Sequence, residues 1–475
     1  MSTVAPFNQE SLPRPYWPRG LEVLVATLAV LLTLVLRLPY QFPLLIIVIG
    51  SFALAVLRVD VFLYAVIFFL PIPLRLPEEF PLHDATMIVR VMMFLGVLVR
   101  FLLEGRSLRS WLLGTRLSQL AIGYGFISVL SALLFNERSA VGMAAPVWLL
   151  SYLCLYFTVI GWVRSQQQMR TVIAVLLLST VIVALFGIYQ ALIGGYSDLY
   201  FWLHASQKEY LLFWTGRITS FLDHFNTLAG YLHLVLPFAL ASTLICVTRG
   251  LRFLAISCLA TATIALILTQ SRGGAFAFGG TILLALFLLA RNTKNIRALA
   301  PTVFLTLIIA LPFVAAFSTR FATLEDESGL MRFGFWGAAW GMFQSSPFVG
   351  VGYGNFVKLY GDSLQSLEAG HYDAHNLYLQ LLAETGVLGF MVFMALVALA
   401  LLAAWRQFHC FQSPTDRIVG FAALAAISSV LVHGFTDTLL DLPQCGALFW
   451  MILALLVAND QLSGDSRLAA KPGLA

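Results

Sequence analysis

The stretch VLGFMVFMALVALALLAAW, residues 387–405, decides the fold class because it runs for nineteen residues without a charged side chain. A helix of about 20 apolar residues is long enough to cross the hydrocarbon core of a bilayer. Backbone polar groups surrounded by lipid must be satisfied within their own segment, so this stretch is predicted to be a transmembrane helix. The composition agrees: 60% of the 475 residues are hydrophobic and only 11% are charged, whereas soluble domains carry roughly 25% charged residues.

Comparable apolar runs recur along the chain and predict an all-α fold, a polytopic transmembrane helical bundle. A transmembrane β-barrel would instead show alternating segments of about ten residues, and the sequence has none. The whole chain, 1–475, is interpreted as a single integral membrane domain. The fourteen candidate spans are 21–37, 42–57, 59–73, 85–103, 118–135, 146–163, 171–193, 226–247, 253–271, 274–290, 299–317, 387–405, 418–436 and 442–459. The third is short and ends in prolines, which leaves the number of spans open at twelve, thirteen or fourteen.

The distribution of lysine and arginine predicts the orientation of the bundle. No small-residue cleavage site follows the first run, so it is expected to remain as a span. With the N-terminus in the cytoplasm, most basic residues fall in short cytoplasmic loops, as the positive-inside rule requires. The net charge of +5 then reflects topology rather than nucleic-acid binding. Two long segments, 194–225 and 318–386, are expected outside the cytoplasm, and long loops on a compact bundle are usually functional.

Arg272 lies between two predicted spans, in the stretch TQSRGGAFAF. A hairpin containing Gly273 and Gly274 would hold the guanidinium at the membrane surface and let a ligand or a neighbouring backbone approach closely. The alternative is an interfacial arginine that snorkels toward water.

Arg332 opens the stretch RFGFWGAAWGMF, in which Arg332, Trp336, Trp340 and Phe343 share one helical stripe. This pattern is typical of an interfacial helix with aromatic rings at headgroup level, here within the long segment 318–386. A plain anchor helix is the alternative. The glycine-rich stretch GVGYGN that follows has no strand before it and does not indicate a dinucleotide site.

Two further arginines are candidates for the same outer surface. Arg217 precedes the span that begins near Asn226, and Asp223 or Asn226 could cap that span. Arg217 is interpreted either as a site residue or as one half of a loop ion pair. Arg90 lies about one turn inside a predicted span, where a charge is costly and is a functional hypothesis by default. It could extend outward into the same site.

The stretch DAHNLYLQLLAETGVLGF begins at Asp373 and carries the candidate catalytic residue. Asp373 is expected to cap a short helix whose first turn holds His375 and Asn376. Glu384 lies nine residues after His375, so it is expected to face away from it and to mark the membrane interface. Gly386 should break the helix before the next span. A histidine at a helix start beside arginine-bearing outer loops is a stronger functional candidate than an isolated loop histidine.

The residues on this surface indicate an anion rather than a metal as the bound group. Several arginines and one histidine at a membrane surface suit a substrate with clustered negative charge and a lipid tail, because the guanidinium fork matches phosphate oxygens. No D-x-D pair lies outside, and the acidic stretch LEDES reads as a solvated loop. No metal and no cofactor are therefore expected. The five cysteines show neither metal-ligand spacing nor a disulfide framework.

Three stretches together resemble the O-antigen ligase and polymerase superfamily: AHNLYLQLLAETGVLGF, SRGG after a span, and RFGFWGAAWGMFQSSPFVGVGYGNF. The resemblance implies a glycosyltransferase of the bacterial cytoplasmic (inner) membrane that acts on its outer, periplasmic face. Such an enzyme moves a glycan from undecaprenyl diphosphate to a hydroxyl group of an acceptor. On this reading Arg272 and Arg332, with Arg217, bind the diphosphate, and His375 activates or orients the acceptor hydroxyl. Arg90, Asn376 and Trp336 are secondary candidates.

Two alternatives stay open at this point. A ligase would use lipid A–core as its acceptor, whereas a polymerase would use another carrier-linked glycan, and the residues do not separate them. A small-solute transporter, such as one for bicarbonate, belongs to another class. A transporter should carry charges near the midplane on interrupted helices, whereas these candidates cluster at one face and only Arg90 is embedded. The pattern therefore favours surface chemistry.

Overall fold

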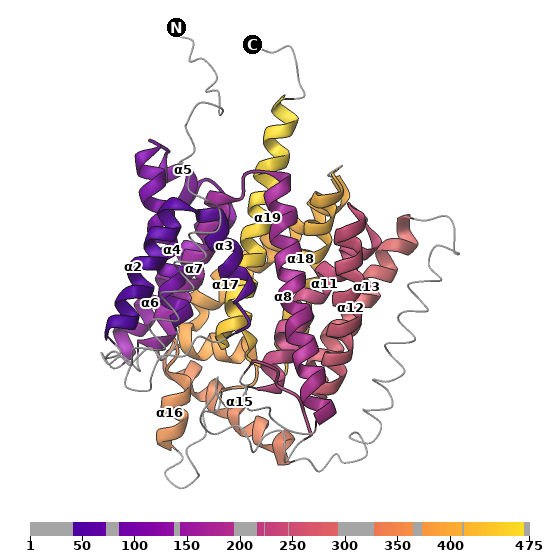
Figure 1. The fold of residues 1–475 in the computed structure, drawn as a ribbon. Helices are drawn as coiled ribbons and strands as arrows, with labels where there is room; N and C mark the ends of the chain where they lie inside the picture. The colour runs from indigo at the N-terminus through magenta and orange to yellow at the C-terminus, as the bar shows by residue number, and fades with distance from the viewer. Residues whose placement is uncertain are drawn as a thin grey trace.

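The structure, a computed structural model, describes residues 41–72, 85–136, 143–193, 216–222, 224–245, 247–292, 327–363, 373–410 and 413–469. Within these ranges every regular element is a helix (Figure 1). The longer helices are α2 (Gln41–Leu57), α4 (Ala85–Leu103), α6 (Arg116–Phe135), α7 (Ala144–Trp162), α8 (Gln166–Ile193), α11 (Phe225–Leu244), α12 (Arg249–Thr269), α13 (Arg272–Asn292), α15 (Glu327–Ser345), α17 (Leu377–Cys410), α18 (Pro414–His433) and α19 (Pro443–Ala469). The short ones are α3 (Val59–Phe68), α5 (Leu108–Leu113), α16 (Phe356–Ser363) and the 3₁₀-helix η2 (Leu439–Asp441).

Nine of the described helices are long and apolar enough to cross a membrane, which confirms the predicted polytopic helical fold. Most predicted spans coincide with a helix to within a few residues at each end. The third is an exception: α3 has 10 residues, a length of roughly 15 Å that reaches only halfway across a bilayer. The predicted spans 21–37 and 299–317 lie outside the described residues.

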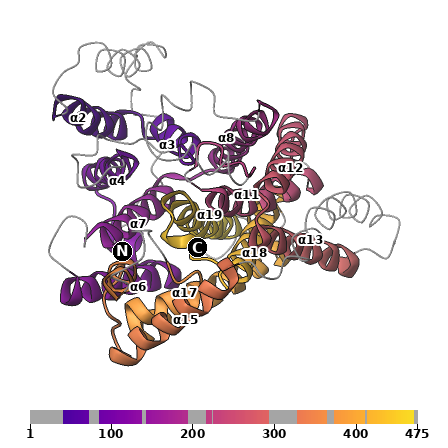
Figure 2. The ribbon, with the colours of Figure 1, turned by 90° about the horizontal axis from the view of Figure 1, so that it is seen from below.

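Three helices form the interior of the bundle. The apolar windows of α11, α18 and α19 are 89%, 78% and 83% buried within the protein, against 33% for α4 and 39% for α12. Figure 2 shows α19 between α7, α11 and α18, with α4 and α12 farther out. The peripheral helices expose large apolar side chains such as Leu192 and Phe253. Lipid tails are the solvent that suits such a surface.

Two helices of the long segment 318–386 lie together at one end of the bundle. Figure 1 shows α15 and α16 below it, across from the C-terminal half of α19. Helices were expected in this segment, and their presence is confirmed. The other long segment, 194–225, lies mostly outside the described residues.

The stretch GVGYGN packs backbone against backbone on a kink in α17. Gly386 interrupts α17 with φ 63° and ψ −170°, and Gly350 has φ 73°. A Cβ on Gly350 would collide with the carbonyl group of Glu384, and one on Gly386 with that of Phe348. The Val351 N–H donates to the carbonyl of Ala383 at 2.8 Å. Glycine is therefore required here for close approach and left-handed backbone, and the predicted break at Gly386 is confirmed.

Candidate active site

The backbone around His375 is fixed by a helix cap, but the cap residue is Asn376 and not the predicted Asp373. The Asn376 Oδ1 accepts the N–H groups of Tyr378 and Leu379, both at 3.1 Å, and thereby caps α17. The predicted cap, Asp373, lies too far upstream for this. His375 lies just before the helix rather than in its first turn, and its backbone is left-handed, with φ 47°.

The start of α17 is fastened to the segment that follows α18. The Leu377 N–H donates to the carbonyl of Gly434 at 2.8 Å. The Asn376 Nδ2 donates to the carbonyl of Phe435 at 3.4 Å. Because these contacts involve the cap residue and the residue that follows it, the approach to α17 cannot shift without breaking them. His375 is therefore held over the C-terminal end of α18.

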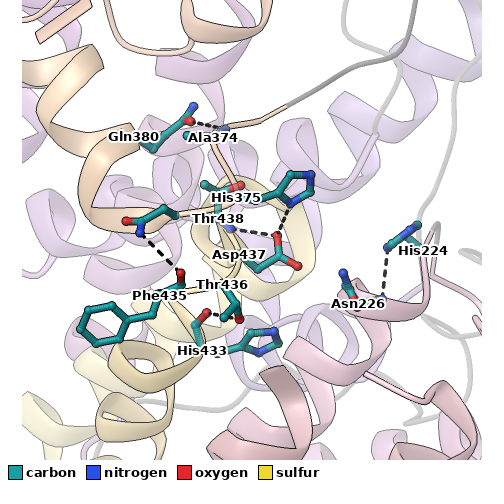
Figure 3. A network of polar contacts seen from close by, with 11 residues as sticks. His224, Asn226, Ala374, His375, Gln380, His433, Phe435, Thr436, Asp437 and Thr438 are labelled. Carbon is teal, nitrogen blue, oxygen red and sulfur yellow. Dashed lines mark hydrogen bonds and ion pairs between the residues drawn. The ribbon is translucent and has the colours of Figure 1, made fainter. Parts of the chain in front are cut away.

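His375 faces a buried carboxylate. Its Nδ1 lies 3.4 Å from the Oδ1 of Asp437, which also accepts the Thr438 N–H at 2.9 Å (Figure 3). The His375 side chain is 29% exposed and that of Asp437 only 8%, so part of the imidazole stays accessible while the carboxylate is nearly enclosed. A carboxylate can only accept hydrogen bonds. The contact therefore favours the tautomer with hydrogen on Nδ1, which leaves the Nε2 lone pair available.

Asp437 remains ionised at any ordinary assay pH. Burial alone would raise its pKa, but the hydrogen bond from His375, the charges of His433 and His375 and the N–H of Thr438 together lower the pKa from 3.8 to about 2. Because the folded value is the lower one, the resulting stabilisation is complete above pH 3.8 and is lost as the pH falls through about 2. A loss of activity between pH 5 and 7 would therefore not arise from titration of Asp437.

Two fully buried histidines lie beneath this pair. The Nδ1 of His433, on α18, is 2.9 Å from the Nε2 of His233, on α11. The Nδ1 of His233 is 2.9 Å from the Oγ of Ser429, whose hydroxyl already donates to the carbonyl of Ala426. His233 must then donate from Nδ1, and His433 must donate to His233. The Asp437 N–H in turn donates to the carbonyl of His433 at 3.1 Å.

Arg272 begins α13, so Gly273 and Gly274 lie in a helical turn rather than in the predicted hairpin. A Cβ on Gly273 would collide with the ring of His433 and crowd the Oγ1 of Thr436, and one on Gly274 would crowd Ala229. The close approach expected at these glycines is thus made by other parts of the protein. Arg272 itself is partly exposed at the start of α13.

The helix α15 lies across the start of α17 and brings Arg332 to the site. The Phe335 side chain is 5% exposed, and its ring centroid lies 5.6 Å from that of His375. The positive charge of Arg332 lies near enough to act on His433. The predicted helix is confirmed, but its buried face carries Phe335 and Ala339, whereas Trp340 is 47% exposed.

A comparison with known protein families matches the part of the chain that contains several of these elements. Residues 257–394 match the O-antigen ligase family. This O-antigen ligase segment contains Arg272, Arg332 and His375, and it ends before His433 and Asp437. The resemblance to the O-antigen ligase and polymerase superfamily is thereby confirmed. No curated protein matches the chain.

With the membrane-length helices, the O-antigen ligase segment indicates a multi-pass membrane glycosyltransferase of the ligase or polymerase type. Substrates linked to a lipid follow from the family in general. The transporter alternative is not favoured.

Arg217 has a capping role that the sequence did not reveal. Its Nε donates to the carbonyl of Thr269 at 2.8 Å and its Nη2 to that of Gln270 at 3.3 Å, at the C-terminal end of α12. A cation favours this end of a helix. The guanidinium also lies 3.1 Å from the ring centroid of Phe225. Arg217 therefore lies at the turn that leads into Arg272, where its guanidinium caps α12.

Two further expectations need correction. Arg90 does not extend outward: it is 2% exposed and lies over the rings of Trp148 and Tyr152, each centroid 5.4 Å away. The cap of α11 is His224, whose Nδ1 accepts the Asn226 N–H at 3.1 Å (Figure 3). Asn226 is thus not the cap, and Asp223 lies outside the described residues.

The secondary candidate Trp336 is partly exposed, and the ring of Phe333 packs edge-on against it. Its indole Nε1 is buried and has no hydrogen-bond partner among the described residues. Among the residues that the structure describes, no three His, Cys, Asp or Glu side chains are grouped as ligands of a metal ion would be.

The sequence reasoning missed Asp437, His433 and His233. A signal was present: His433 and Asp437 lie four residues apart at the outer end of a predicted span, and His233 lies inside another. An ionisable residue within a span is a functional hypothesis by default, and this holds for the two histidines as it does for Arg90.

Proposed function

We propose that the chain transfers a glycan from undecaprenyl diphosphate to an acceptor hydroxyl group at the outer face of the cytoplasmic membrane. The observation that carries this proposal is the His375–Asp437 pair beside Arg332 and the start of α13, within and next to the O-antigen ligase segment. An oriented base, cations and a membrane surface are what such a transfer requires.

In the proposed reaction, His375 acts as the general base and the arginines bind the leaving diphosphate. The acceptor oxygen attacks C1 of the first sugar, the bond from C1 to the diphosphate oxygen breaks, and the hydroxyl proton passes to the Nε2 of His375. Asp437 stabilises the imidazolium that forms. Arg332 and Arg272 stabilise the negative charge that develops on the departing undecaprenyl diphosphate. Arg217, at the adjoining turn, completes the cationic surface.

The acceptor is either lipid A–core, as for a ligase, or another carrier-linked glycan, as for a polymerase. Both present a hydroxyl to the same base, so the described geometry suits either. The experiment that tests the proposal incubates purified protein with lipid-linked glycans extracted from the cells that naturally express the chain. Mass spectrometry should detect release of undecaprenyl diphosphate and a glycosylated acceptor, whereas an intact donor after long incubation would contradict the proposal.

Replacing Arg332 with lysine should weaken donor binding or turnover about ten- to a hundredfold. Lysine keeps the charge but loses the two-pronged fork, and one charge-assisted hydrogen bond contributes about 1.5–3 kcal/mol. The matched control is Arg406→Lys, because Arg406 pairs with Asp460 at 2.6 Å on the exposed far part of α17. Equal activity of both variants in the transfer assay would remove Arg332 from the diphosphate site.

Activity should persist after treatment with EDTA, because arginines are proposed to replace a cation at the diphosphate. The measurement is the initial rate of transfer before and after exhaustive chelation. Complete loss with recovery on addition of Mg²⁺ or Mn²⁺ would instead show that carboxylates hold a metal with the diphosphate.

The site is proposed to lie outside the cytoplasm, with both termini inside. Single cysteines at Ser206 and Ser363, in a variant without the native cysteines, should react with a membrane-impermeant thiol reagent in intact spheroplasts. Cysteines placed at Ser165 and Ser413, which directly precede α8 and α18 at the end of the bundle away from α15 and α16 (Figure 1), should react only after lysis. The reverse pattern would contradict both the orientation and the chemistry.

A further inference from the structure

A buried chain of hydrogen bonds leads to the residue that precedes His375 and joins three parts of the protein. The Glu384 side chain lies in α17 and is 2% exposed, and its Oε1 accepts the Gln380 Nε2–H at 2.9 Å. Gln380, one helical turn earlier and 3% exposed, accepts the Ala374 N–H on its own Oε1 at 2.9 Å. Ala374 directly precedes His375 (Figure 3). The carboxylate is thus connected to the backbone that presents the imidazole.

The same carboxylate holds the glycine-rich stretch. Its Oε1 accepts the N–H of Phe356, the first residue of α16, at 3.1 Å, and the N–H of Gly354 also interacts with it. Two N–H groups at the start of a helix suit a negative charge. Glu384 was expected to mark the membrane interface and to face away from the histidine. Instead it is enclosed by protein and joins α16 to the approach to α17.

Only one orientation of the Gln380 amide pairs all the polar atoms in this series of hydrogen bonds. Gln380 must direct its NH₂ toward the carboxylate and its oxygen toward the Ala374 N–H, because the reverse would set two acceptors and two donors against each other. A fully paired buried network specifies a single conformation. A left-handed residue other than glycine persists only where its surroundings determine it. His375 is such a residue, with φ 47°.

We infer that Glu384 and Gln380 are positioning residues for His375, and that they couple docking of the segment 346–356 to the conformation of the proposed base. The inference rests on the proposed function. When that segment lies on the kink of α17, Glu384 is held by the N–H groups of Gly354 and Phe356. Gln380 then fixes Ala374, and His375 is presented to Asp437. The long outer segment and the reacting group are thereby assembled together.

Two substitutions of Gln380 distinguish positioning from general stability. Gln380→Leu is close in size and removes both hydrogen bonds. Gln380→Glu keeps an acceptor for Ala374 but sets two carboxylates together. At lower pH such a pair can share one proton, which restores a donor between them. The acidic side chains that interact with Glu384 are Asp373 and Asp441, and a negative charge on either favours uptake of that proton.

The control is Gln407→Leu. Gln407 is fully buried near the other end of α17, where its Nε2 donates to the carbonyl of Leu456 at 2.8 Å and its oxygen accepts from Asn459. This variant removes a comparable pair of hydrogen bonds from the same helix. It should lower the thermal midpoint of unfolding without changing the turnover number of the folded protein.

The experiment measures turnover with extracted lipid-linked glycans, binding of undecaprenyl diphosphate, and the thermal midpoint, for each full-length variant in detergent micelles. Gln380→Leu should lower turnover at least tenfold at every pH while binding of undecaprenyl diphosphate is retained. The turnover of Gln380→Glu, relative to the unmodified chain, should rise as the pH is lowered from 8 to 6. This pH dependence is a signature that loss of stability alone would not give.

Several results would overturn the inference. They are unchanged turnover in Gln380→Leu, an equal loss in Gln407→Leu, a loss of undecaprenyl diphosphate binding together with turnover, or a Gln380→Glu ratio that does not change with pH. If the unmodified protein transfers no glycan, the proposed function itself is wrong, and this inference is overturned with it.

Discussion

Replacing His375 with alanine should lower the turnover number for glycan transfer about 10²- to 10⁴-fold, the usual contribution of a general base. This range corresponds to about 2.7–5.5 kcal/mol of activation free energy. Binding of undecaprenyl diphosphate should change little, because the imidazole is proposed to act on the acceptor hydroxyl. The fold should persist, since His375 is 29% exposed by its side chain and lies outside α17. Alanine also has to adopt the left-handed backbone at this position, at a modest cost in stability.

The measurement compares turnover and donor binding in well-expressed protein. The matched control is His409→Ala, because His409 is an exposed histidine near the far end of the same helix. If His375→Ala transfers glycan at the full rate, His375 is only a residue at a helix start. If the variant instead fails to bind undecaprenyl diphosphate, His375 belongs with the arginines as a ligand of the phosphates.

Replacing Asp437 with asparagine should lower turnover on the order of 10²-fold, within the loss caused by removing His375 itself. The amide oxygen can still accept from the Nδ1 of His375 and from the Thr438 N–H, which the carboxylate Oδ1 now accepts together. The orientation and tautomer of the ring can therefore be kept. The negative charge is lost, and with it the stabilisation of the imidazolium formed when the acceptor proton is taken up.

A lower turnover number with unchanged binding of undecaprenyl diphosphate is the expected pattern for Asp437→Asn. Asp460→Asn is the control, because Asp460 forms a partly exposed ion pair with Arg406 away from the site. Since the pKa of Asp437 is about 2, the defect should be present throughout the pH range from 5 to 8. A variant as active as the unmodified chain would show that the carboxylate only fastens the backbone.

The helices could be predicted from the sequence because lipid imposes a strong local constraint. Each apolar run must satisfy its own backbone, so length and composition are sufficient, and α4 coincides with the predicted range 85–103. The uncertain status of the third predicted span has the same origin. An apolar run can be buried by neighbouring helices without crossing the membrane, and Val59, Leu63 and Ile67 are fully buried against them.

The site was only partly predictable, because its contacts join positions far apart in the sequence. His375 and Arg332 could be proposed as candidates from local patterns. Asp437 lies 62 residues after His375, in the short connection between the predicted spans 418–436 and 442–459. The capping role of Arg217 could not be predicted, because the carbonyls that it caps lie more than fifty residues away, at Thr269 and Gln270. Glu384 was placed at the interface because helical spacing from His375 does not reveal the contact with Phe356.

Whether His375 and Asp437 act as one unit can be measured most directly with a double-mutant cycle on the turnover number. The four proteins are the unmodified chain, His375→Ala, Asp437→Asn and the double variant, all assayed with the same extracted lipid-linked glycans. If Asp437 acts through His375, the double variant should be no slower than His375→Ala alone, since a charge without its imidazole has nothing to stabilise. A double variant whose loss equals the product of the two single losses would contradict the joint role of the pair.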